Sequence, residues 1–143
     1  MRRVVIRQFK LEDADILCPI ALETSLRTDP EFYRKWAVIN LTSGAAYTGE
    51  IDGQPVLAGG VRIQDEGQGY LWAVLTPDAS RYRIAVIRAI RDMLSILIDE
   101  FEFVTLIADS RKGFTASQRL LEHLGFRRYD ENSTHYLYIR NIT

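Results

Sequence analysis

The chain has 143 residues, of which 47% are hydrophobic and 10% aromatic, which is enough apolar material for one domain over residues 1–143 with a core of its own. Its formal net charge of -1 gives no overall attraction to nucleic acid or to an anionic membrane, although its 15 arginines far outnumber its 3 lysines. A single cysteine, Cys18, excludes an intrachain disulfide, and the absence of a signal peptide or a long apolar run predicts a cytoplasmic protein without membrane partners.

The N-terminal part of the chain predicts one strand and two helices. Residues 4–9 have the composition of a strand, and residues 14–26 show partial helical spacing. Asp13 can cap the start of this helix, and Pro19 can split or kink it. A second helix is expected over residues 31–41, because Pro30 suits a first-turn position.

Three strands of an antiparallel meander are expected next, over residues 45–51, 55–64 and 70–76. Asp52-Gly53 joins the first two, since this dipeptide favours the positive φ angles of a tight hairpin turn. Within the middle strand, Gly59-Gly60 predicts a β-bulge.

The second half of the chain predicts a long helix, a buried strand, a short helix and a final strand pair. In residues 83–101 apolar side chains recur every three or four positions from Ile84 onward, so one helix face belongs to the core. The continuous apolar run in residues 103–109 is typical of a strand buried on both faces. The remaining elements are a helix that Gly125 ends and two strands, over residues 115–124, 126–129 and 135–140.

These elements predict an α/β (α+β) fold with a mixed, mostly antiparallel sheet flanked by helices. A strand that leads into a helix N-terminus forms an anion site, so we expect a coenzyme cleft where residues 70–76 meet the long helix. Arg81 and Arg83 lie near the positive end of that helix, where a bound anion would compensate their positive charge. For Arg88 and Arg91 a solvated helix face is the preferred interpretation.

The segment Arg119-Leu-Leu-Glu-His-Leu-Gly-Phe126, in this order of elements, resembles the Leu-Tyr-Glu-Lys-Leu-Gly-Phe type segment of the GNAT superfamily of N-acetyltransferases. The resemblance covers nearly the whole chain. It implies a GNAT-like domain that binds acetyl-CoA and transfers the acetyl group to a small-molecule or protein amine.

The same resemblance implies where the coenzyme would bind. The pantetheine arm would run along residues 70–76, with the thioester carbonyl near the main-chain N–H groups of Val74 and Leu75. The pyrophosphate would rest on the window of residues 81–86, which supplies a further set of cofactor-binding candidates: Arg81, Arg83, Ile84 and Ala85. Ser110, after the buried strand, is the nearest polar equivalent of an asparagine that often contacts the coenzyme; a turn and helix cap is an equal interpretation of that segment.

Two departures from the family pattern concern catalysis. Ile84 and Val86 stand where the phosphate loop has small residues, and Leu121 stands where many members have a tyrosine that protonates the leaving thiolate. Tyr136, like Tyr129 and Tyr138, is a candidate replacement for that acid.

The attacking amine needs a base, because a protonated amine has no lone pair. The candidates are Glu50, Glu23 and Asp78, although each is more simply an ordinary surface carboxylate.

Both departures resemble the degenerate GNAT-like proteins of tailed bacteriophages, the internal virion protein A group. That resemblance implies a second interpretation, in which the chain keeps the fold without the chemistry and acts as an interaction module in virion morphogenesis. Its partners would be virion proteins or a second copy in a homodimer, and its location the host cytoplasm or the virion. The sequence leaves the enzyme and the interaction module as alternatives, and a nucleic-acid partner is the least favoured.

Overall fold

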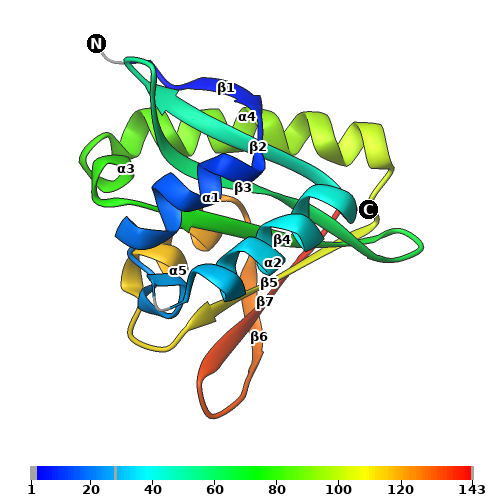
Figure 1. Ribbon diagram of the computed structural model, residues 1–143. Coiled ribbons are helices and arrows are strands. Elements are labelled where there is room, and N and C mark those ends of the chain that lie inside the picture. The colour runs from blue at the N-terminus through cyan, green and yellow to red at the C-terminus, as the bar shows by residue number, and fades with distance from the viewer. Residues whose placement is uncertain (1–2, 28, 143) are drawn as a thin grey trace.

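The computed structural model describes residues 3–27 and 29–142 and contains one seven-stranded sheet (Figure 1). The strands are β1 (Val5–Gln8), β2 (Gly44–Ile51), β3 (Gln54–Asp65), β4 (Gln68–Leu75), β5 (Thr105–Arg111), β6 (Arg127–Glu131) and β7 (His135–Asn141). The helices are α1 (Leu11–Leu17), the 3-10 turns η1 (Cys18–Ile20) and η2 (Thr24–Arg27), α2 (Pro30–Thr42), α3 (Pro77–Arg81), α4 (Arg83–Phe101) and α5 (Thr115–His123). Among these residues no helix is long and apolar enough to cross a membrane.

The sheet has the strand order β1-β2-β3-β4-β5-β7-β6. All neighbouring strands are antiparallel except β4 and β5, which run parallel. A mixed, mostly antiparallel sheet is therefore confirmed. Helices α1 and α2 cover one face of the sheet and α4 and α5 lie against the other, as Figure 1 shows.

The meander of β2, β3 and β4 forms as the sequence predicts. Asp52 and Gly53 have φ angles of 52° and 77°, the positive values that a tight hairpin turn requires. The bulge expected at Gly59-Gly60 is wrong, because the register runs through both glycines and shifts instead at Gly49/Glu50 and at Ile63/Asp65. Gly60 serves a different purpose: a Cβ there would lie 1.9 Å from the carbonyl oxygen of Ala45 on β2.

Helix α4 has the predicted bounds, but its buried face differs from the expected one at the start. The buried residues are Val86, Leu94 and Leu97, which follow one another at helical spacing. Ile84 is 73% exposed, which corrects its assignment to the apolar face. Since each residue turns a helix by about 100°, Ile84 lies about 200° from Val86 and faces solvent.

The helix expected over residues 14–26 is shorter and starts earlier. Helix α1 ends at Leu17, and Pro19 lies in the 3-10 turn that follows, as the predicted split requires. Asp13 is inside the first turn of α1 and is 1% exposed. Its carboxylate accepts hydrogen bonds of 2.8 Å from the Lys10 N–H and from the Thr48 hydroxyl of β2.

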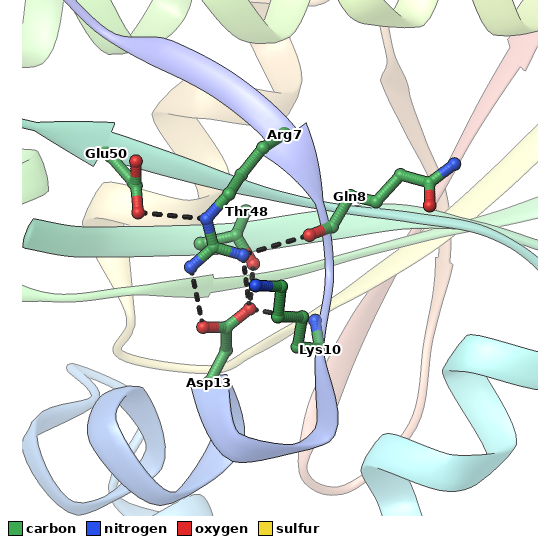
Figure 2. Close-up of polar contacts among 6 residues, drawn as sticks. All are labelled: Arg7, Gln8, Lys10, Asp13, Thr48 and Glu50. Atoms are coloured by element: carbon green, nitrogen blue, oxygen red, sulfur yellow. Dashed lines mark hydrogen bonds and ion pairs between the residues drawn. The ribbon is translucent and has the colours of Figure 1, made fainter. Parts of the chain in front are cut away.

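Arg7 of β1 completes this network (Figure 2). Its Nη1 and Nη2 atoms each donate to the Asp13 carboxylate at 2.8 Å, and its Nε donates to Glu50 at 2.9 Å. Burial raises the pKa of the Asp13 carboxyl, but the Arg7 guanidinium and the other donors outweigh burial, so the pKa lies below its usual range. The network fastens α1 to the β1–β2 edge of the sheet.

Candidate functional site

The parallel strands β4 and β5 separate along their length. Their register joins Gln68 with Thr105, Gly69 with Leu106 and Tyr70 with Ile107, and it ends there. Beyond this point β4 still pairs with β3 and β5 still pairs with β7. The sheet therefore opens between the C-terminal halves of β4 and β5, the end of parallel strands where open sheets bind ligands.

Alternate peptide groups of β4 face the opening between β4 and β5. The Leu75 carbonyl accepts a 2.8 Å hydrogen bond from the Leu22 N–H, so the Leu75 peptide groups face away from β3. Peptide groups alternate between the two edges of a strand, so those of Ala73 also face the opening, while those of Val74 face β3. The Val74 side chain is 1% exposed and belongs to the core under α1 and α2. This corrects the expected donor: Leu75 remains at the groove, and Ala73 takes the place of Val74.

A groove follows the opening, and we call it the β4–β5 groove. Strands β4 and β5 form its floor, the segment between α1 and α2 forms one wall and α5 forms the other. Side chains that line it include Glu23, Ser25, Trp36, Arg62, Tyr70, Trp72, Asp109, Ser110, Arg111, Leu120, Leu121 and His135.

Tyr70 and Asp109 join the two diverging strands. The Tyr70 hydroxyl donates to Asp109 Oδ1 at 2.9 Å, and the Arg62 guanidinium carbon lies 4.5 Å from the centre of the Tyr70 ring. Burial, and after it the negative charge of Asp109, raise the pKa of Tyr70 above its usual value. The phenol therefore stays protonated and holds the carboxylate at the floor of the groove.

Several buried polar atoms of residues that line the groove have no hydrogen-bond partner among residues 3–27 and 29–142. They are Ser110 Oγ, Trp72 Nε1 and Arg62 Nε, and the whole residues Ser110 and Trp72 are 2% and 6% exposed. Buried polar groups are ordinarily paired, because an unpaired one costs about 1–3 kcal/mol. Among the described residues, the other side-chain atoms of this kind are the Asn40 amide nitrogen and oxygen, which lie outside the groove.

A second depression continues the groove toward the start of α4. It shares Leu75 and Leu120 with the β4–β5 groove and is also lined by Ser80, Arg83, Arg119 and His123. The first intrahelical bond of α4 runs from the Val86 N–H to the Tyr82 carbonyl at 3.0 Å. The N–H groups at residues 83–85 therefore come before that bond, where a helix offers donors to an anion.

The predicted phosphate window, residues 81–86, lies at this depression, but its two β-branched side chains do not both line it as the sequence suggested. Val86 is 4% exposed, packs in the core and also lines this depression, whereas Ile84 is 73% exposed and does not line it. Ile84 and Ala85 line a concave surface on the outer side of α4 with Arg3, Arg81, Arg83 and Arg88. Arg81 also lies 3.7 Å from Asp78.

The two predicted catalytic residues lie away from the groove. Glu50, on β2, accepts a hydrogen bond from Arg7 of β1 (Figure 2). Tyr136, on β7, is partly buried and packs against the core, with the Arg128 guanidinium carbon 3.5 Å from its ring centre. The other carboxylates considered divide between two places: Glu23 lines the groove, 3.7 Å from Arg111, and Asp78 is on α3 beside Arg81.

Sequence reasoning missed the Tyr70–Asp109 pair, because the two residues are 39 positions apart in the sequence. Leu121, the position of the expected tyrosine, lines the groove and is 5% exposed. No cluster of His, Cys, Asp or Glu among residues 3–27 and 29–142 could hold a metal ion.

No protein-family model matches this sequence, and no curated protein matches it. Solved structures do match. A GNAT-family acetyltransferase from Bacillus anthracis superposes with a TM-score of 0.74 at 18% identity, over 99% of this chain and 98% of that one. The ribosomal-protein-S18-alanine N-acetyltransferase from Escherichia coli gives a TM-score of 0.70 at 18% identity, over 98% and 94%.

A third solved structure, the aminoglycoside acetyltransferase AAC(6')-Ib in complex with coenzyme A and kanamycin, has a TM-score of 0.73 at 13% identity, over 97% of this chain and 95% of that one. At these identities the matches establish the fold: the chain has the fold of GNAT acetyltransferases.

Proposed function

We propose that the β4–β5 groove binds an acyl-CoA thioester, acetyl-CoA in the simplest case, and that the protein transfers the acyl group to an amine. The observation that carries the proposal is the separation of β4 from β5 beside unpaired buried polar groups. The shared fold adds support, because a neighbour of that fold is solved with coenzyme A and an aminoglycoside amine.

The main chain of β4 supplies the carbonyl site in this proposal. The N–H of Ala73 or Leu75 donates to the thioester oxygen, which gains negative charge as the amine attacks. Preorganised donors of this kind contribute about 10²–10³-fold to rate. The Ser110 hydroxyl, for which the described part of the chain supplies no hydrogen-bond partner, donates to the coenzyme on the β5 side.

The pyrophosphate binds where the groove reaches α4. The N–H groups of residues 83–85, which precede the first hydrogen bond of α4, and the positive end of the α4 dipole favour an anion. Arg83 and Arg119 line this depression and supply positive charge, and Arg81 adds to the field from α3.

Carboxylates in the groove hold the acceptor. A cationic amine is attracted to Glu23 on the wall and Asp109 on the floor, and Glu23 takes the proton that the amine must lose before it can attack. The coenzyme supplies the activated thioester, and the amine attacks it directly, without a covalent enzyme intermediate.

Calorimetric titration with coenzyme A tests the proposal. The wild-type protein binds it, and Arg83→Glu weakens binding about fivefold or more, since reversing a charge near a phosphate costs at least ~1 kcal/mol even in high dielectric. Arg127→Glu, on the exposed strand β6, is the matched control and leaves the dissociation constant unchanged.

An absence of coenzyme binding would refute the proposal and would favour the interaction module expected from the phage resemblance. That module predicts self-association or co-purification with virion proteins, so light scattering of the purified chain separates the two.

A further inference from the structure

An apolar cavity lies between the sheet and the α4–α5 layer, next to the β4–β5 groove. Its volume is about 60 Å³. Helix α4 contributes Ile90, Met93, Leu94 and Leu97, and α5 contributes Leu120 and Leu124. The opposite side is formed by Ile6, Tyr47 and the small residues Gly49, Ala58, Gly59, Gly60 and Ala73.

Small residues on β3 and β4 leave this space open. Gly59 and Ala73 pair across the two strands, and a Cβ added at Gly59 would lie 3.6 Å from the Ala73 Cβ. Larger side chains at these two positions would fill the space under the sheet. The cavity therefore depends on two residues at the centre of β3 and β4.

The cavity adjoins the place where a thioester would be polarised. It shares Leu71, Trp72, Ala73 and Leu120 with the β4–β5 groove. Ala73 presents its peptide groups to the opening of the sheet, so a carbonyl bound there lies at the boundary between groove and cavity. The acyl chain attached to that carbonyl would extend toward the cavity.

The size of the cavity sets the length of chain. One water-sized group occupies about 10–15 Å³ by this measure, and a methylene is of similar size. A cavity of about 60 Å³ therefore holds roughly four to six such groups. Its side chains are almost all aliphatic, and an empty apolar cavity gains nothing from water but binds hydrocarbon.

We propose that this cavity receives the alkyl chain of the acyl donor, and that the preferred donor is an acyl-CoA with about four to six carbons beyond the carbonyl rather than acetyl-CoA. The inference rests on the proposed function, since the cavity adjoins the coenzyme groove and shares four lining residues with it. It adds a substrate class that the fold does not specify.

Calorimetric titration with coenzyme A and with its acetyl, butyryl, hexanoyl, octanoyl and decanoyl thioesters tests the inference. Affinity rises about fourfold for each added methylene up to about hexanoyl, as expected for burial of a methylene in an apolar site. It stops rising once the chain exceeds the cavity. Free coenzyme A has no acyl chain and reports the groove by itself.

Two substitutions at one position change the cavity in opposite directions. Met93 lines the cavity and not the groove. Met93→Phe fills the space and removes the gain beyond acetyl, and Met93→Ala moves the maximum to a longer chain. Ile96→Phe adds the same ring on the exposed side of α4, where Ile96 is 55% exposed, and keeps the wild-type series.

Each outcome decides between the two proposals. Coenzyme A that binds with a flat chain-length series, or with acetyl-CoA as the tightest ligand, overturns the chain cavity and leaves the proposed function in place. A rising series that Met93→Phe does not alter also overturns it, because the chain would then lie elsewhere. If neither coenzyme A nor any thioester binds, both proposals fail.

Discussion

Substitution of Asp13 by alanine is expected to be among the most destabilising changes of a charged residue in this chain. Asp13 is 1% exposed and accepts four hydrogen bonds of 2.8 Å, two of them from Arg7. Breaking a buried ion pair by removal of one partner costs about 3–5 kcal/mol. In the variant Arg7 keeps its ion pair with Glu50 and its side chain is 27% exposed, so its charge is not left buried without a partner. We therefore expect a loss of unfolding free energy at the lower end of this range, about 3 kcal/mol.

The assay is urea unfolding followed by circular dichroism, with Asp15→Ala as the matched control. Asp15 pairs with Arg34 at 2.9 Å, but the two side chains are 44% and 62% exposed, so its loss costs less than about 1 kcal/mol. The Asp13 variant should also melt roughly 6–12 °C lower, at about 2–4 °C per kcal/mol for a chain of this size. Equal losses for the two variants would refute the view that burial makes the Arg7–Asp13 pair important.

The pH dependence gives a second reading of the same group. Because the pKa of Asp13 is lowered in the folded protein, the unfolded chain takes up the proton first as pH falls. The contribution of Asp13 is therefore complete above the unfolded pKa of about 3.9 and is lost as pH falls toward the folded pKa. The difference in stability between the wild type and Asp13→Ala should be constant near neutral pH and shrink below about pH 4.

Two further predictions concern the sheet and the groove. Gly60→Ala should lower the free energy of unfolding by about 3 kcal/mol or more, because its Cβ would lie 1.9 Å from the Ala45 carbonyl oxygen. Urea unfolding measures this loss. A loss below about 1 kcal/mol would mean that β2 and β3 separate easily. Glu23→Gln should slow acyl transfer to a primary amine about 10²-fold or more with little change in coenzyme affinity. The rate is measured by release of the coenzyme thiol. Glu50→Gln is the comparison, and a larger loss of rate in that variant would place the base on β2.

The sequence predicts well those elements whose signal is local. The apolar spacing of α4 and the turn residues Asp52-Gly53 each act within a few positions, and both are confirmed. Periodicity also gave a wrong assignment for Ile84, since positions 84, 87 and 90 share the spacing of a helix face with positions 86, 90 and 94. Which of two overlapping stripes meets the sheet depends on how α4 is docked, and a single sequence does not contain that information.

The site was harder to predict, because its members come together only through the sheet. Glu50 was a reasonable base by composition, but the β1–β2 pairing places it opposite Val5 and beside Arg7. Tyr136 lies opposite Ser110 on the neighbouring strand, yet its ring packs into the core. Tyr70 and Asp109 meet only because β4 and β5 are parallel neighbours, and no local pattern announces that pairing.

Two departures from the family pattern have different weight under the proposed function. Ile84 faces solvent and leaves the depression at the start of α4 open, whereas the Val86 side chain, which is 4% exposed, lines that depression. The leucine at 121 is the more consequential departure, because it removes a proton donor from the groove.

Even so, a thiolate can leave without prior protonation, so loss of the acid affects the step less than loss of the carbonyl donors on β4 would. Activity should therefore depend more on the main chain of β4 than on any tyrosine.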